Sequence, residues 1–207
     1  MRPDEQQAFE TELSRVFLAG DHTETLRRLI DGYGPEILGY LSRTMNDEQA
    51  ADDVFSDFCE DLCRSIGGFE QRSLFRTWAY RLATSARARF WEDPYRRRGE
   101  RLVSEEIGKI EQQVRTETHA WLRTEVKTRF AELRRFLDAE EQTLLTLRID
   151  KDLSWEEIAE VMTPAAETVD NRVIRKRASS LRQRFKRLKD KIRRLADEHG
   201  IFDRPVE

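Results

Sequence analysis

The feature that most constrains this chain is a stretch from Ser154 to Arg194 with the pattern of two helices joined by a tight turn. Ser154 and Glu157 have the spacing of a capping box, in which each side chain bonds the other residue's free backbone amide at a helix start. Thr163 is the expected N-cap of the second helix, and Pro164 then falls in its first turn, where a missing amide costs nothing. We expect the second helix to bury one apolar stripe (Val169, Val173, Leu181, Phe185 and Leu188).

The second of these helices is densely basic. Between Ala165 and Leu195 there are twelve basic residues against three acidic ones. A basic run of this kind is often only a solvated, salt-bridged helix, but here few acids lie within the run to pair with the bases. Two short helices, the second strongly basic, are typical of a helix-turn-helix whose second helix enters a DNA major groove. The stretch therefore predicts DNA binding.

Composition indicates an all-α protein. Of the 207 residues, 38% are hydrophobic and 37% are charged, which favours small helical bundles over one thick core. No stretch alternates apolar and polar residues long enough to predict a strand. The sequence has no run of about 18 apolar residues to span a bilayer, and its N-terminus is too polar for a signal peptide, so we expect a cytoplasmic protein without membrane insertion.

Charge is strongly segregated along the chain, although the net charge is only −3. Residues 46–61 contain seven acids and no base, whereas residues 72–98 contain eight arginines and two acids. Such blocks predict separate surfaces with separate partners.

The chain divides into two predicted helical domains. We expect an N-terminal domain over residues 1–98, a linker with helical tendency over 99–120, a C-terminal helix-turn-helix domain over 121–195 and a tail over 196–207. Further helix starts are predicted by local caps, which are Asn46 with Gln49, Ser73, and Asp138 with Glu141. A break is expected near Gly32 to Pro35, and the first helix of the second domain near Trp121 to Phe136.

Both domains carry motifs of one protein family. The acidic segment AADDVFSDF (residues 50–58) and the segment FEQRSLFRTWAYRLA (69–83) lie in the first domain, and LDAEEQTLLTLRIDKDLSWEEIAEVM followed by ETVDNR lies in the second. In this order and spacing, the chain resembles a bacterial RNA polymerase sigma factor of the extracytoplasmic-function (ECF) type. The resemblance implies a non-enzymatic subunit that binds core RNA polymerase and promoter DNA and directs promoter recognition, melting and initiation, for a stress- or signal-responsive set of genes.

The resemblance also implies which residues act. The acidic helix would bind basic side chains of the polymerase (Asp52, Asp53, Asp57, Glu60 and Asp61). Arginines of the first domain would hold promoter DNA near the start site (Arg72, Arg76, Arg81, Arg87 and Arg89), and the loop from Gly68 to Ser73 would receive an extruded base. The second domain would read the upstream promoter element (Asp170, Asn171, Arg172, Ile174 and Arg175), since arginine pairs with guanine and asparagine with adenine in the major groove.

Three other features were weighed. Cys59 and Cys63 lie four residues apart and invite a redox or zinc hypothesis, but free cysteine more often fills a core. Ser56 lies in the acidic segment, where phosphorylation would add charge, although an exposed, unmodified serine is the simpler interpretation. No catalytic set, metal-ligand spacing or cofactor-binding motif is present, so neither an enzyme nor a cofactor is predicted.

The alternative function is a free-standing helix-turn-helix regulator that never binds polymerase. The acidic segment argues against it, because such a regulator does not need that surface. The sequence leaves open whether an anti-sigma factor, a kinase or the tail after Leu188 controls activity.

Overall fold

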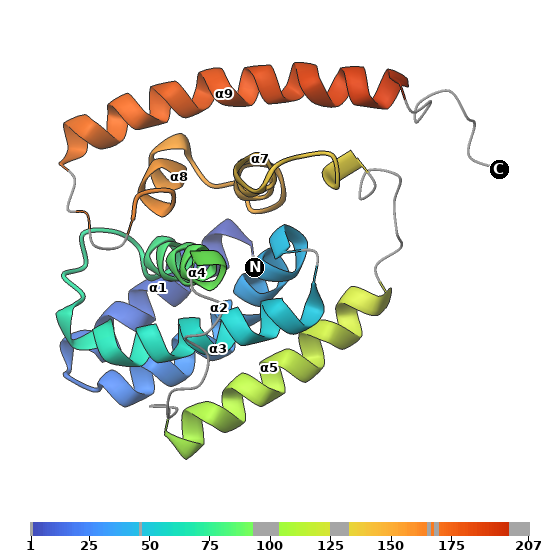
Figure 1. Ribbon diagram of the computed structural model, residues 1–207. Helices are drawn as coiled ribbons and strands as arrows, with labels where there is room; N and C mark the ends of the chain where they lie inside the picture. The colour runs from blue at the N-terminus through green and yellow to red at the C-terminus, as the bar shows by residue number, and fades with distance from the viewer. Residues whose placement is uncertain are drawn as a thin grey trace. The chain divides into compact units, whose positions relative to one another are not determined.

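A computed structural model describes residues 2–45, 47–92, 104–124, 133–164, 167 and 170–198. The chain forms two compact units, one built mainly from residues 1–123 and the other from 124–160 and 167–207. All regular elements of the described residues are helical (Figure 1), as the sequence predicts. No helix among the described residues is long and apolar enough to cross a membrane.

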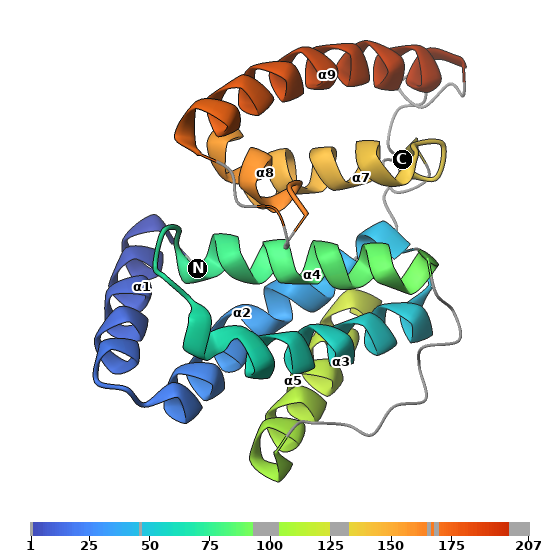
Figure 2. The ribbon, with the colours of Figure 1, turned by 60° about the vertical axis from the view of Figure 1, so that its left-hand side comes forward.

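The first unit is a helical bundle made of α1 (Pro3–Leu18), α2 (His22–Met45), α3 (Glu48–Ser65), the short 3-10 helix η1 (Ile66–Gly68), α4 (Phe75–Glu92) and α5 (Glu105–Thr124). The helices α2, α3 and α4 pack on one another, and α1 lies across one end of this group (Figure 2). Their apolar stripes meet in a core of fully buried large side chains (Leu29, Ile30, Tyr33, Ile37, Leu38, Tyr40, Leu41, Phe55, Phe58, Phe75 and Tyr80).

The helix α2 continues through the segment where a break was predicted. Pro35 lies inside it, so the Gly32–Pro35 expectation was wrong. The glycines there serve close packing instead. A Cβ at Gly32 would collide with the Phe9 ring of α1, and a Cβ at Gly34 would lie 3.2 Å from the Val114 side chain of α5. Both neighbouring helices can therefore approach α2 closely.

Two of the five predicted caps are confirmed, and the one expected at Thr163 is not formed because α9 (Asn171–Glu198) begins at Asn171. Ser154 with Glu157, and Asp138 with Glu141, each exchange the two hydrogen bonds of a capping box. The N-cap of α3 is Asp47, whose carboxylate accepts from the Ala50 amide at 3.2 Å, and not the predicted Asn46, which is outside the described residues. The cap expected at Ser73 is not formed. Glu10, a residue distant in sequence, binds the first amides of α4 instead.

Most of the segment expected to be a linker is the helix α5, which packs on α2 and α3. Ile107 and Val114 are each 2% exposed, so α5 buries an apolar stripe in the first unit. The sequence suggested a linker because most of this segment is polar. Most of these polar side chains are exposed, but Glu111 and Thr118 are buried, and Glu111 accepts a hydrogen bond from Ser56 of α3.

The second unit contains α7 (Ala139–Leu145), the π-helical turn η3 (Thr146–Asp150), α8 (Trp155–Val161) and α9 (Asn171–Glu198). Its core joins leucines of α7 and η3 and Ile158 of α8 to one stripe of α9 (Leu144, Leu145, Leu147, Ile158, Ile174, Ala178, Leu181, Phe185 and Leu188). Residues 125–132 of the helix expected near Trp121 to Phe136, and Val169 of the expected apolar stripe, lie outside the described residues, and Phe136 is 50% exposed.

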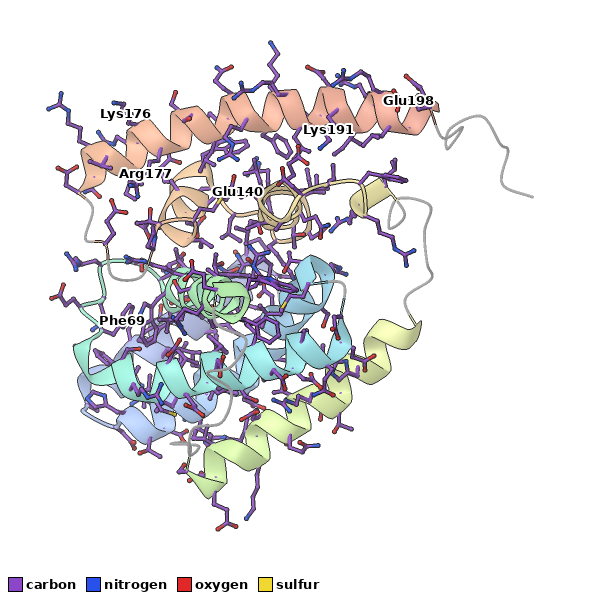
Figure 3. The ribbon with its side chains drawn as sticks, viewed as in Figure 1. Phe69, Glu140, Lys176, Arg177, Lys191 and Glu198 are labelled. Carbon is purple, nitrogen blue, oxygen red and sulfur yellow. The ribbon has the colours of Figure 1, made fainter. Side chains whose placement is uncertain are left out.

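The basic face of α9 is partly neutralised within its own unit. Lys191 pairs with Glu141 at 2.6 Å, and Arg184 pairs with Glu140, both acids of α7 (Figure 3). Arg177 pairs with Glu167 at 2.7 Å. The acids that the basic run lacks in sequence are thus supplied by other segments, and only part of α9 keeps uncompensated charge.

Candidate protein-binding and nucleic-acid interfaces

The acids of α3 lie on two stripes of the helix. Glu48, Asp52 and Ser56 recur every four residues and face α5, and we call them the covered stripe. Asp53, Asp57, Glu60 and Asp61 lie further round the helix, and we call them the open stripe. The predicted polymerase-binding set therefore does not form one uniform surface.

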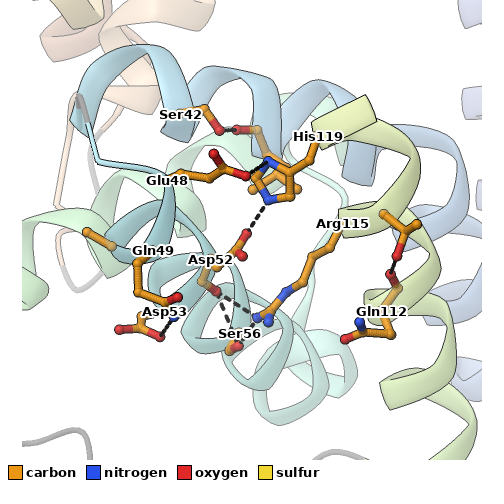
Figure 4. A network of polar contacts seen from close by, with 12 residues as sticks. Ser42, Glu48, Gln49, Asp52, Asp53, Ser56, Gln112, Arg115 and His119 are labelled. Atoms are coloured by element: carbon orange, nitrogen blue, oxygen red, sulfur yellow. Dashed lines mark hydrogen bonds and ion pairs between the residues drawn. The ribbon is translucent and has the colours of Figure 1, made fainter. Parts of the chain in front are cut away.

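The covered stripe is held by two residues of α5 (Figure 4). The His119 imidazole lies 2.7 Å from the Asp52 carboxylate through Nε2 and 3.1 Å from Glu48 through Nδ1. The Arg115 guanidinium donates to the Asp52 carbonyl oxygen at 2.7 Å and also to the Ser56 hydroxyl. Asp52 is therefore already bound within its own chain, through its carboxylate by an imidazole and through its carbonyl oxygen by a guanidinium.

Ser56 is buried, which corrects the interpretation of an exposed serine. It is 7% exposed and its hydroxyl donates to Glu111 of α5 at 2.9 Å. The helix α5 thus covers the hydroxyl and separates it from solvent.

The open stripe is only partly available. Glu60 pairs with Arg64 at 2.8 Å, and Asp61 pairs with Arg89 of α4. Asp57 is exposed to solvent, yet partial desolvation and the neighbouring Glu60 and Asp61 carboxylates raise the pKa of its carboxyl. Asp57 is exposed and has two carboxylates beside it, so it is the part of α3 best suited to a basic partner.

Two of the arginines predicted to bind DNA are buried in the first unit instead. Arg76 forms an ion pair with Glu36 of α2 and lies over the Tyr80 ring, and Arg87 lies over the Tyr40 ring. Each arginine is 9% exposed. Their guanidinium groups stabilise the packing of α4 on α2 and are not placed to bind phosphates.

The other three predicted arginines of this unit differ in environment. Arg72 is exposed in the loop before α4, where it pairs with Glu70 at 2.8 Å, and Arg81 is half-buried on α4. Arg89 binds Asp61, so one residue of the predicted DNA surface pairs with one of the predicted polymerase surface. Sequence separation into acidic and basic blocks did not reveal this pairing.

The start of α4 is organised by Glu10, a residue that the sequence analysis did not single out. Its carboxylate accepts from the Phe75 and Arg76 amides at 2.8 and 2.9 Å and from the Tyr33 hydroxyl at 2.7 Å. Burial and the Glu10 carboxylate raise the pKa of Tyr33, which keeps its hydroxyl protonated as a donor. Glu10, not Ser73, therefore satisfies the first amides of α4.

The loop before α4 borders a pocket of about 430 Å³. One wall is this loop, in which Gln71 has a left-handed backbone with φ of 52°, and the other wall is α1. Phe69, at the start of the loop, stacks on Trp78 of α4 with ring centroids 4.5 Å apart and so attaches the loop to that helix. The pocket is large enough for a nucleobase, and its α1 wall is polar (Gln7, Glu10, Thr11 and Ser14).

The helix α9 begins at Asn171, later than the predicted start after Thr163. Asp170 precedes it, and its carboxylate accepts from the Val173 amide at 2.8 Å, so Asp170 is engaged in capping. Ile174, one of the residues predicted to touch DNA, is 6% exposed and belongs to the core, whereas Val173 is 36% exposed. The predicted faces of these two neighbours, Val173 in the core and Ile174 on DNA, were therefore wrong.

Three of the predicted residues at the start of α9 form an exposed polar surface (Asn171, Arg172 and Arg175). Within the described part of the chain, Arg172 and Arg175 make no ion pair, whereas Arg177, two residues after Arg175, pairs with Glu167. The first turn of α9 therefore exposes two guanidinium groups, of Arg172 and Arg175, beside the amide side chain of Asn171.

The two cysteines are free thiols. Cys59 is fully buried in the core of the first unit, which confirms the core-filling interpretation, and Cys63 is half-buried. Partial burial raises the pKa of the Cys63 thiol, with a smaller contribution from Glu60. Among the described residues, no cluster of His, Cys, Asp and Glu has the arrangement of a metal site.

Comparison with known proteins shows the family of the chain. Residues 29–98 match the family described as Sigma-70 region 2. The chain is 30% identical over 155 residues to the RNA polymerase sigma-H factor of Pseudomonas aeruginosa, covering 72% of this chain and 80% of that protein. It is 29% identical over 155 residues to the ECF RNA polymerase sigma-E factor of Haemophilus influenzae (72% and 82% covered) and 30% over 146 residues to the RNA polymerase sigma factor YlaC of Bacillus subtilis (68% and 81%).

Proposed function

Because the chain belongs to the ECF-type RNA polymerase sigma factors, we propose that the open stripe of α3 contacts core polymerase and that the start of α9 reads the upstream promoter element. The chain is thus a polymerase-binding initiation factor and not a free-standing regulator. It would act without catalytic chemistry of its own, in the cytoplasm where polymerase and promoter are found.

One observation carries the promoter assignment. At the start of α9, Ile174 is buried in the core of the second unit, while Asn171, Arg172 and Arg175 are exposed. The first turn therefore packs through its apolar side and leaves its polar side open to solvent. Asparagine and arginine make bidentate contacts to adenine and guanine edges in the major groove. Asp170 would fix where the helix begins and so set the angle at which these side chains reach the bases.

The first unit would act near the start site. Arg72 is the arginine best placed for promoter phosphates there, since it is exposed with one surface ion pair to Glu70, whereas Arg76 and Arg87 are buried, Arg89 pairs with Asp61 and the half-buried Arg81 donates to the Pro164 carbonyl oxygen. The pocket between α1 and the 68–73 loop would receive the extruded base. Residues 1–98 and 121–195 would then be the two functional domains, with α5 attached to the first.

The test is transcription by holoenzyme reconstituted from core polymerase and the full chain. Asp53→Asn with Asp57→Asn removes two charges of the open stripe, and we expect at least tenfold weaker binding to core, since charge pairs at such contacts are worth about one to a few kcal/mol each. The loss should be larger at low salt than at high salt. Unchanged core affinity in this folded variant would refute the polymerase assignment.

Promoter reading is tested separately with a library randomised in the upstream element. Arg175→Ala should change the selected bases at one or two positions, whereas Arg193→Ala, an exposed arginine near the other end of α9, should leave them unchanged. Selection of the same motif by both variants would show that the start of α9 does not read DNA bases.

A further inference from the structure

The helix α5 occupies part of the surface by which this protein is proposed to bind polymerase. In the close-up of Figure 4, the Arg115 and His119 side chains reach from α5 to the covered stripe of α3. The Asp52 side chain is 19% exposed under this cover, and Ser56 is buried. The His119 imidazole meets the Asp52 and Glu48 carboxylates, as a basic group of a polymerase would, while the Arg115 guanidinium holds the Asp52 carbonyl oxygen and the Ser56 hydroxyl and pairs with Glu111 of its own helix.

The contact is adjacent to the open stripe. Asp52 and Asp53 are consecutive, and Asp57 follows the buried Ser56. A partner that binds the open stripe would therefore lie directly beside α5. A basic partner surface wide enough to include Asp52 would have to take the place of Arg115 and His119.

The interface between α5 and α3 has features of a contact that can be undone. Its recorded contacts are polar, because the buried apolar residues of α5 in the described part of the chain are few, namely Ile107 and Val114, and Val114 lies against Gly34 of α2. Two polar atoms that α5 buries, Arg115 Nε and Thr118 Oγ1, have no hydrogen-bond partner among the described residues. Buried polar groups without partners weaken an interface, because water would satisfy them if the helix came away.

We infer that α5 is an internal competitor for the polymerase-binding surface of α3, and that polymerase binding displaces it by replacing Arg115 and His119 at Asp52. This inference rests on the proposed polymerase contact. Binding then requires the form in which α5 is undocked. The apparent affinity for polymerase therefore equals the intrinsic affinity of that form multiplied by the fraction of molecules that adopt it. Weakening the docked form should raise the affinity.

Two loosening variants of the full chain separate displacement from a simple change of charge. Arg115→Ala with His119→Ala removes the polar contacts, and Ile107→Ala with Val114→Ala removes apolar packing without altering charge. We expect both to bind core polymerase at least threefold more tightly than the unaltered chain. The matched control is Gln113→Ala with Glu117→Ala, an exposed hydrogen-bonded pair of the same four-residue spacing on the outer side of α5, which should leave affinity unchanged.

Hydrogen exchange on the free chain and on holoenzyme provides the direct readout. Amides of residues 108–119 should exchange faster in the holoenzyme than in the free chain. Equal or slower exchange there, or a rise in affinity confined to the charge-removing variant, would overturn the displacement. If Asp53→Asn with Asp57→Asn weakens core binding while both loosening variants leave it unchanged, the inference alone fails. If the acid variant binds normally, the polymerase assignment itself fails.

Discussion

The Glu10 carboxylate accepts a hydrogen bond from the Tyr33 hydroxyl at 2.7 Å and, with its two oxygens, binds the first two amides of α4. The relationship joins three helices through one buried side chain, since Glu10 is 4% exposed. It also places α1 against the loop of residues 68–73, so that α1 forms a wall of the pocket beside that loop.

Glu10→Gln should therefore destabilise the first unit. An amide has one acceptor oxygen, and its NH₂ group would face a backbone amide donor, so we expect a loss of about 2–3 kcal/mol, the size of a charged hydrogen bond left unmade. Thermal unfolding would measure this loss. Glu12→Gln is the control, because Glu12 lies two residues away on α1 in solvent-exposed ion pairs with Arg15 and Arg28, and its unfolding temperature should stay close to that of the unaltered chain.

Arg76 should prove to be a structural residue. Its side chain is 11% exposed and pairs with Glu36, so Arg76→Ala leaves a carboxylate in a largely buried place and should cost about 3 kcal/mol of stability. Arg72→Ala, at an exposed position, should instead leave stability nearly unchanged and reduce the salt dependence of promoter binding by about one unit of slope. Promoter binding by the two variants, measured from low to high salt, distinguishes the structural role of Arg76 from the phosphate contact of Arg72. A lower slope in Arg76→Ala, in a variant that still folds, would contradict the structural role.

Asp57→Asn should increase stability while it weakens polymerase binding. Burial and two neighbouring carboxylates raise the pKa of Asp57 in the folded chain, so its ionised form is disfavoured there. The penalty is present above the folded pKa and is lost as pH falls below the ordinary pKa of aspartate, where both states are protonated. At neutral pH we expect a gain of roughly 0.5 kcal/mol, limited by solvent screening. Chemical denaturation at neutral and acidic pH would test it, and a gain that persists below the ordinary pKa would be the contrary result.

The Cys63 thiol should react slowly. Because its pKa is raised, the thiolate fraction at pH 8 is smaller than that of a free cysteine, and Cys59 is fully buried. Alkylation of the native chain, followed by peptide mass spectrometry, should label Cys63 slowly and Cys59 only on unfolding. Labelling of Cys63 should accelerate as pH rises above the usual thiol pKa. Labelling at the rate of a free cysteine at pH 8 would reopen the redox hypothesis.

Local and long-range features differ in how far the sequence could predict them. The Ser154–Glu157 and Asp138–Glu141 caps involve residues three apart, so sequence spacing alone identifies them. Glu10 bonds amides 65 and 66 residues away, and no local pattern indicates that a lone acid on the buried side of α1 has such partners. The same limit applies to α5, whose polar residues are explained only by the acids of α3 that they meet.

The buried arginines show a second limit. Arg76 and Arg87 have the sequence context of a basic DNA-binding surface, and arginine is seldom fully buried unless paired. The pairing partner Glu36 and the Tyr40 ring lie on α2, a separate helix, and only the packing of α2 on α4 brings them together. A block of like charges in a sequence therefore does not show which of its residues lie on the surface.

The last prediction concerns the two neighbours at the start of α9. In a helix, Ile174 lies seven residues from Leu181 and thus within about 20° of it around the axis, whereas Val173 lies about 80° away. Ile174 is accordingly buried and Val173 exposed, and we expect Ile174→Ala to cost about 2–4 kcal/mol and Val173→Ala less than about 1 kcal/mol. Arg175→Ala should leave stability almost unchanged and cost about 1–3 kcal/mol of binding on the preferred upstream element. Unfolding curves and competition binding on preferred and scrambled DNA would measure these effects. Equal weakening of both DNAs by Arg175→Ala, or an equal stability loss at positions 173 and 174, would show that α9 is oriented differently from the arrangement described above.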